Sequence, residues 1–229
     1  MKPYIFLSEN YLHNAQDSNG NAINAIDIST SDLPYTLTVY FADIYGNPTA
    51  RTIDTLILQD TNIQNLTLAY EKNGAYTNIL TLSNNTASTV LLKAANAVAT
   101  SSIQITLGAT NPASVAAKLG VYGFICNLLA LTDSNYKIAA NQGDYRVVSG
   151  DYIHWADYKK WVCKVKMENL PKDQFDALTA QADKGEMTVV PYTELEATAI
   201  YECGVNREYS YELDRKTELF SLTLELNEL

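Results

Sequence analysis

The sequence predicts a mainly β protein of two domains, and three observations lead to that expectation. In the first half of the 229 residues, short runs of β-branched and aromatic residues alternate with turn-forming residues. Only one segment, at about residues 171–184, has the pattern of a packed helix. Charge is also unevenly divided: residues 1–125 hold 5 Lys and Arg and 8 Asp and Glu, whereas residues 126–229 hold 11 and 18. We therefore expect domains at 1–125 and 144–229, joined by a connector at 126–143.

The first domain is expected to be an antiparallel β-sandwich. In the run Tyr35–Phe41, the apolar residues Leu37, Val39 and Phe41 alternate with polar or aromatic ones, which places one face of a strand in a core and the other in water. Turn residues separate the runs, as expected of short strands joined by tight connections. The predicted strands are Tyr35–Phe41, Thr52–Leu58, Leu66–Tyr70, Asn78–Leu82, Thr89–Leu92 and Ser102–Leu107.

The second domain is expected to be β-rich around one helix. Pro171 suits the first helical position, Asp173 the positive amino end, Lys184 the negative carboxyl end and Gly185 a left-handed cap. The apolar residues of this helix form a narrow stripe, which should lie on a sheet. The predicted strands of this domain are Trp161–Met167, Met187–Pro191, Glu194–Glu202, Tyr209–Leu213 and Leu219–Leu226.

Residues 1–125 resemble the discoidin-like, or galactose-binding-like, jelly rolls. The resemblance lies in the run Thr52–Ile63 and in the strands Leu66–Tyr70, Ser102–Leu107 and Lys118–Tyr122 that follow it. It implies a jelly-roll sandwich. Many domains of this group bind sugars or lipids at loops on one end, and many others only pack against neighbouring subunits.

A sugar site needs aromatic rings to stack on the sugar and amides to reach its hydroxyls. Four residues in predicted loops offer these groups: Tyr45, Asn47, Asn73 and Tyr76. Asn and Tyr are also common in turns for purely structural reasons, and this alternative remains open.

The second half is similar to tail proteins of bacteriophages and related injection machines. The similarity covers about residues 136–229 and lies in the order of its elements, which are Gly150–Trp155, Tyr158–Trp161, Asn169–Leu178 and Val190–Tyr192. It implies a tail-tube-like β-barrel or sandwich that assembles with copies of itself into a ring, beside other tail or baseplate proteins. Distal-tail proteins usually carry such a domain first, whereas here it comes second.

Composition argues against several classes of function. The formal net charge of −10 disfavours specific nucleic-acid binding. An acidic channel through which DNA slides and simple solubility both account for that charge. His13 and His154 are the only histidines, and no nucleophile, acid–base or nucleotide-binding motif accompanies them, so we expect no enzyme, catalytic residue or cofactor. The most apolar window, Val121–Leu131, is too short for membrane insertion.

Cysteine usage points to a reducing compartment. Cys126, Cys163 and Cys203 are odd in number and widely spaced, so neither a disulfide framework nor a metal site is indicated.

The two-domain β architecture and the tail-like second half together lead to one hypothesis: a structural virion protein of a phage tail tip or baseplate, assembled in the host cytoplasm and in contact with host surface glycans. The alternative is a carbohydrate-binding module without a virion role.

Overall fold

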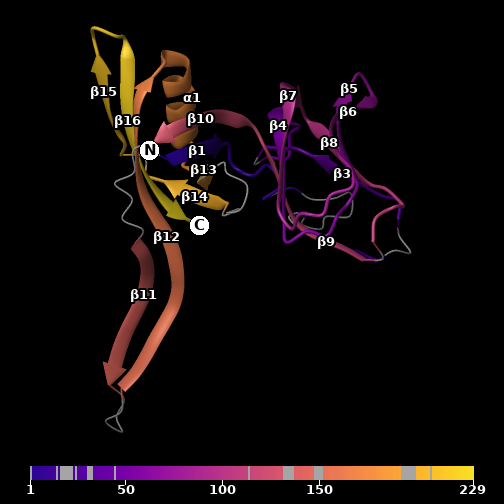
Figure 1. Cartoon of the computed structure of the whole chain (residues 1–229), viewed down its shortest axis with the longest axis horizontal. Helices are drawn as coiled ribbons and strands as arrows, with labels where there is room; N and C mark the ends of the chain where they lie inside the picture. The colour runs from indigo at the N-terminus through magenta and orange to yellow at the C-terminus, as the bar shows by residue number, and fades with distance from the viewer. Residues whose placement is uncertain are drawn as a thin grey trace. The chain divides into compact units, whose positions relative to one another are not determined.

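The computed structural model in Figure 1 divides the chain into two compact units. It describes residues 2–13, 15, 23, 25–29, 33–43, 45–112, 114–130, 137–146, 152–191, 200–206 and 208–229. One unit, here called the sandwich unit, is Ser8–Phe124; the other, the helix-bearing unit, combines Met1–Leu7 with Ile125–Leu229. The described residues form sixteen strands and one helix, which confirms the mainly β class.

Two antiparallel four-stranded sheets make up the sandwich unit, as expected of a jelly-roll sandwich. In order, one sheet consists of β2 (Ala25–Ser29), β9 (Ser114–Tyr122), β4 (Arg51–Gln59) and β7 (Val90–Thr100), and the other of β3 (Tyr35–Tyr40), β8 (Ser102–Leu107), β5 (Leu66–Lys72) and β6 (Ala75–Leu82). Leu37 and Val39 are buried in one core with Ile103 and Ile105 of the neighbouring strand. The predicted alternation therefore points its apolar face inward.

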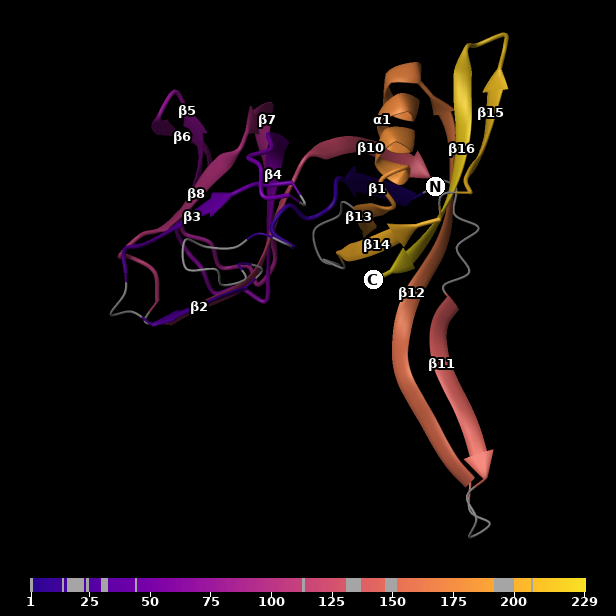
Figure 2. The same cartoon turned by 180° about the vertical axis from the view of Figure 1, so that it is seen from behind.

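A single sheet dominates the helix-bearing unit (Figure 2). Its main path runs β10 (Phe124–Ala130), β1 (Lys2–Leu7), β13 (Glu186–Pro191), β14 (Tyr201–Val205), β16 (Leu219–Glu228), β12 (Tyr152–Leu170) and β11 (Lys137–Arg146), and β15 (Ser210–Asp214) also pairs with β16. Among the described strands the path is open, which corrects the expectation that this domain could be a barrel. In both ribbon views β11 and the paired half of β12 extend away from α1 as a long hairpin.

The predicted helix is confirmed as α1 (Lys172–Ala182) and is slightly shorter than 171–184. Pro171 precedes the helix rather than beginning it, and Gly185 adopts φ +92° in the turn that ends it. Leu178 and Ala182 are fully buried in the core of this unit. Phe175, which is half-buried, stacks on Phe220 of β16 with ring centroids 4.2 Å apart. The apolar stripe therefore lies on the sheet.

The observed units differ from the predicted domains at both boundaries. Strand β1 pairs with β13, so Tyr4 lies opposite Pro191 and Phe6 opposite Val189, and both aromatic rings are buried in the core of the helix-bearing unit. The predicted connector 126–143 contains most of β10 and the start of β11. Most of the predicted strand Glu194–Glu202 lies outside the described residues.

The chain enters and leaves the sandwich unit at one place. The Ser8 amide donates to the Gly123 carbonyl (2.9 Å), and the Gly123 amide donates to Ser8 Oγ (3.0 Å). A Cβ at Gly123 would lie 2.7 Å from the Thr52 carbonyl oxygen, so glycine is required for this close approach. Because β1 and β10 are neighbouring strands, the sandwich unit is an insertion between two adjacent strands of the other unit.

All three cysteines are free and buried in the core of the helix-bearing unit. Burial raises the pKa of the Cys126 thiol to about 12 and that of Cys163 to about 11, and it also raises the pKa of Cys203. The fold therefore holds these thiols in their protonated, unreactive form.

We expect the native protein to resist a thiol reagent such as Ellman's reagent at pH 8 and to release three equivalents in denaturant.

The buried thiols also make stability depend on pH. In the unfolded protein a cysteine thiol ionises near pH 9, whereas in the folded protein the buried thiols stay protonated. The contribution of these thiols to stability is therefore intact below pH 9 and declines at higher pH. Relative to Cys126→Ala, the wild type should lose about 1 kcal/mol of unfolding free energy between pH 9 and 10, because the unfolded thiol ionises over this range and the buried one does not. Equal pH slopes in denaturant titrations of the two proteins would contradict this.

Candidate functional site

The four candidate ligand residues lie at one end of the sheet β3-β8-β5-β6. The pairing of Tyr40 with Ser102 and of Tyr70 with Ile103 places the end of β3, the start of β8 and the end of β5 together. The turn at 73–74 leads from β5 into β6, and the loop 41–50 leaves from β3. We call this the tyrosine end: the loop residues 41–43 and 45–50, the turn 73–74, and residues Tyr40, Ser102 and Tyr76. Tyr45 and Asn47 belong to its loop, Asn73 to its turn and Tyr76 to the start of β6.

Tyr45 stands on a loop that the Asp43 carboxylate holds in shape. Asp43 Oδ1 accepts hydrogen bonds from the amides of Tyr45 (2.8 Å) and Asn47 (2.9 Å), and Asn47 Nδ2 donates to Oδ2 (3.0 Å). The hydrogen bond from the Asn47 side chain is the main reason that the pKa of Asp43 is lowered. Gly46 takes φ +84° at the turn. The Tyr45 side chain remains 82% exposed, on a loop already ordered by these contacts.

Asn47 and Asn73 have structural tasks at this end. The Asn47 side-chain nitrogen is engaged by Asp43, so it braces the loop that carries Tyr45. Asn73 adopts φ +54° and Gly74 φ +80°, the left-handed pair that a two-residue hairpin turn requires. The turn alternative left open for the asparagines thus accounts for both positions.

Tyr76 and Tyr40 flank Ser102 across the sheet. The Tyr76 hydroxyl lies 2.7 Å from Ser102 Oγ, while Tyr40 is the direct cross-strand partner of Ser102. Tyr76 is 37% exposed and Tyr40 is 59% exposed, whereas Ser102 is buried. Tyr40 was not among the predicted site residues because it lies within a strand. Its outward position in the alternation of Leu37 and Val39 is the signal that identifies it.

Asparagines at the opposite end of this sheet hold loops together. The Asn111 side chain is nearly buried, and its Oδ1 accepts from the amides of Gln64 and Asn65, both at 2.8 Å. Its Nδ2 donates to the carbonyls of Asn65 (2.7 Å) and Gly108 (3.2 Å). Asn62 and Asn85 likewise bond to the backbone. Much of the asparagine content of this unit therefore serves its loops.

The described part of the chain shows neither a metal-binding cluster nor a membrane-spanning helix. There, no group of three or more His, Cys, Asp and Glu side chains is placed to hold a metal ion. No described helix is both long and apolar enough to cross a bilayer. His13 is exposed, and the side chain of His154 lies outside the described set.

The chain is similar in structure to several carbohydrate-binding modules. The family 32 module of Streptococcus pneumoniae EndoD is 10% identical and covers 49% of this chain and 98% of its own, with a TM-score of 0.40. Module CpGH89CBM32-5 of Clostridium perfringens, solved with GalNAc-β-1,3-galactose, is 14% identical over 43% of this chain and 75% of its own, with a TM-score of 0.35. A chitosan-binding module of a Paenibacillus chitosanase/glucanase is 11% identical over 51% and 99%, with a TM-score of 0.38. No protein-family model and no curated protein matches the chain.

Proposed function

We propose that the sandwich unit binds a carbohydrate at the tyrosine end. The observation that carries the proposal is the 82% exposure of Tyr45 on a loop that Asp43 has already ordered. An exposed aromatic ring is costly in water and suited to stacking against the C–H face of a sugar. Because the loop is fixed beforehand, binding loses little conformational entropy.

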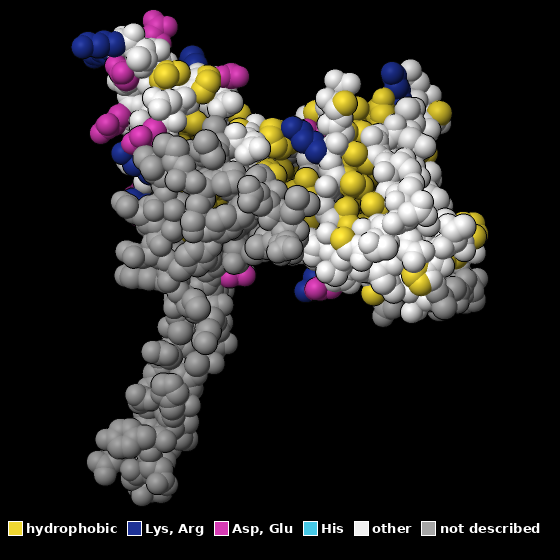
Figure 3. Space-filling model, viewed as in Figure 1, with side chains coloured by type: hydrophobic (Ala, Val, Ile, Leu, Met, Phe, Trp, Pro, Cys, Tyr) yellow, Lys and Arg dark blue, Asp and Glu magenta, His cyan; other side chains and the backbone are white. Residues whose placement is uncertain are grey.

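The charge of the sandwich unit argues against an anionic ligand. The whole sandwich unit carries 4 Lys and Arg and 8 Asp and Glu, so it attracts neither nucleic acid nor an acidic polymer. Figure 3 shows few charged side chains on the visible face of this unit. Tyr40 and Tyr76 add two further rings at the same end. A neutral glycan matches this combination of rings, hydroxyls and sparse charge.

Tyr45→Ala is expected to weaken glycan binding at least ten-fold, because it removes the exposed ring without touching the core. Tyr76→Ala should weaken binding as well, whereas Tyr76→Phe keeps the ring and loses only the contact with Ser102. The measurement is a glycan array followed by calorimetry on the glycans that bind. The matched control is Tyr211→Ala, an exposed tyrosine of the other unit. A blank array, or full binding by Tyr45→Ala, would count against the proposal.

A second candidate function is assembly as a structural protein of a phage tail tip or baseplate. The specific observation that favours assembly is β15, whose five residues are all exposed and which pairs, among the described strands, with β16 alone. Tyr211 and Leu213 on it are 59% and 48% exposed. An exposed edge strand with apolar side chains is a place where another chain adds on. A virion protein that also contacts host glycans would combine both functions.

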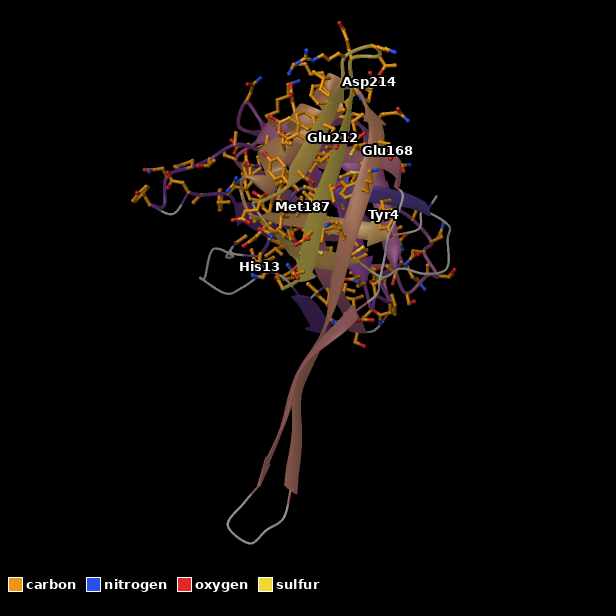
Figure 4. The ribbon with its side chains drawn as sticks, turned by 90° about the vertical axis from the view of Figure 1, so that its left-hand side faces the viewer. Tyr4, His13, Glu168, Met187, Glu212 and Asp214 are labelled. Atoms are coloured by element: carbon orange, nitrogen blue, oxygen red, sulfur yellow. The ribbon has the colours of Figure 1, made fainter. Side chains whose placement is uncertain are left out.

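We expect Leu213→Lys to reduce self-association, because it places a charge on that edge. Figure 4 labels Glu212 and Asp214, which flank Leu213 on β15, so the edge already carries acidic neighbours of Leu213. Mass photometry of the wild type and the variant over a concentration series measures the effect. Thr52→Ala, an exposed change on β4, is the control. A wild type that stays monomeric and never enters particles would exclude this candidate.

A further inference from the structure

The outward face of the sheet β3-β8-β5-β6 is built from three rows of side chains. The first row crosses all four strands with a threonine on each: Thr36 pairs with Thr106, Thr106 with Thr67, and Thr67 with Thr81. The hydroxyls of Thr36 and Thr106 lie 3.4 Å apart. These threonines are half-buried or exposed.

The second row continues the same chemistry with amides. Thr38 pairs with Gln104, Gln104 with Ala69, and Ala69 with Asn78. Gln104 Nε2 donates to Thr38 Oγ1 (3.4 Å), while Ala69 lies buried between the two amide-bearing residues. Asn78 is exposed at the outer strand.

The third row is the strand part of the tyrosine end. Tyr40 pairs with Ser102 on one side, and Glu71 pairs with Tyr76 on the other. Glu71 is the only charged residue in the three rows, although the sandwich unit has twelve charged residues. The face thus combines rows of hydroxyls and amides with two partly exposed aromatic rings, those of Tyr40 and Tyr76.

We infer that this face, here called the threonine face, binds an extended neutral glycan chain that starts at the tyrosine end and runs across the three rows. The inference rests on the proposed function and names its ligand as an oligomer rather than a single sugar. Rows follow one another at about 7 Å and strands at about 4.8 Å, so the face extends about 14 Å in each direction. That area exceeds what one sugar ring covers.

The chemistry of the threonine face selects a glycan over a protein partner. A protein interface has a largely apolar centre, whereas the centre of this face carries Thr106, Thr67 and Gln104 around one small apolar residue, Ala69. Each threonine hydroxyl both donates and accepts, and each amide does so through two atoms, as a polyhydroxylated chain requires. The near absence of charge removes the attraction that an ionic polymer would need.

The test compares chain lengths and face variants. The probes are cello-, N-acetylated chito- and β-1,4-galacto-oligosaccharides of one to six units, measured by calorimetry against the wild type. We expect at least a ten-fold gain in affinity from one unit to four in at least one series. Gln104→Ala/Thr106→Ala should abolish this gain and leave monosaccharide binding unchanged. The matched control is Thr52→Ala/Gln59→Ala on β4 of the other sheet, and thermal melts verify that all variants fold.

The outcomes separate this inference from the proposed function. Binding that is equal for one and six units, or a length gain that survives Gln104→Ala/Thr106→Ala, overturns the threonine face and leaves the tyrosine end intact. Loss of binding in Tyr45→Ala at every length supports the tyrosine end as the starting point. No binding in any of the three series also overturns the inference, and the glycan array then decides whether the proposed function fails with it.

Discussion

Leu178→Ala should lower the unfolding free energy of the helix-bearing unit by about 2–5 kcal/mol. The Leu178 side chain is fully buried, and it lies in the core cluster that also contains Met167 and Leu222 of the sheet. Truncation removes its transfer free energy and leaves a cavity that the surrounding strands fill only in part. Because α1 packs on the sheet through few large side chains, this one contributes much of the contact.

Tryptophan fluorescence during denaturant titration measures this loss in the correct unit. Trp155 and Trp161 are the only tryptophans of the chain, and both belong to the helix-bearing unit, so the sandwich unit does not contribute to the signal. Leu213→Ala, which truncates a half-exposed leucine of the same unit, is the control and should cost well under half as much. Equal midpoints for the Leu178 variant and the wild type would place the helix outside the core.

Asn111→Ala is expected to destabilise the sandwich unit by about 2–4 kcal/mol, because it removes a buried side chain that makes four hydrogen bonds to part-buried backbone groups. The amides of Gln64 and Asn65 lose the oxygen that accepts from both, and the carbonyls of Asn65 and Gly108 lose a donor. Near-UV circular dichroism of the tyrosines, or the sandwich transition in calorimetry, reports the change.

Two further variants separate the hydrogen bonds from the side-chain volume. Asn111→Asp keeps an oxygen for the two amides but turns a second oxygen toward the two carbonyls, so it should also destabilise the unit. Asn96→Ala, at an exposed position of β7, removes the same atoms from water and should change stability by less than about 0.5 kcal/mol. If Asn111→Ala matched Asn96→Ala, the loop network would carry no net stability.

Local patterns in the sequence predict local structure well in this protein. Alternation such as that of Leu37 and Val39 depends on neighbours in one strand, and the structure confirms both the strand and its buried face. The helix is confirmed to within two residues of its predicted end, because Gly185 stops it through a backbone angle. The pairing of Tyr4 with Pro191 has no such local signal, since the partners are far apart in the chain. The unit boundaries therefore differ from those that composition predicts.

For the candidate site too, local patterns predict some residues, whereas contacts between distant segments appear only in the folded structure. Residue type and turn context select Tyr45 as a candidate. Tyr76, which was predicted to lie in a loop, is instead the second residue of β6, and strand pairing places it at the same end of the sheet as the loop of Tyr45. The sequence could not show that the Asn47 side chain donates a hydrogen bond to the Asp43 carboxylate, because that contact depends on loop geometry. It also could not show that four threonines from four strands form one row, because each lies in a different run. Their register becomes visible only when the sheet is assembled.

The reciprocal hydrogen bonds between Ser8 and Gly123 make the sandwich unit exchangeable. Its two chain ends meet side by side, and the strands that receive them, β1 and β10, are neighbours in the other sheet. Any domain whose termini lie equally close could take its place, and a short turn could replace it without changing the order of the remaining strands. A single proteolytic cut in either connection would still leave the two units covalently joined. The sheet of the helix-bearing unit can therefore keep its topology whichever domain is inserted between β1 and β10.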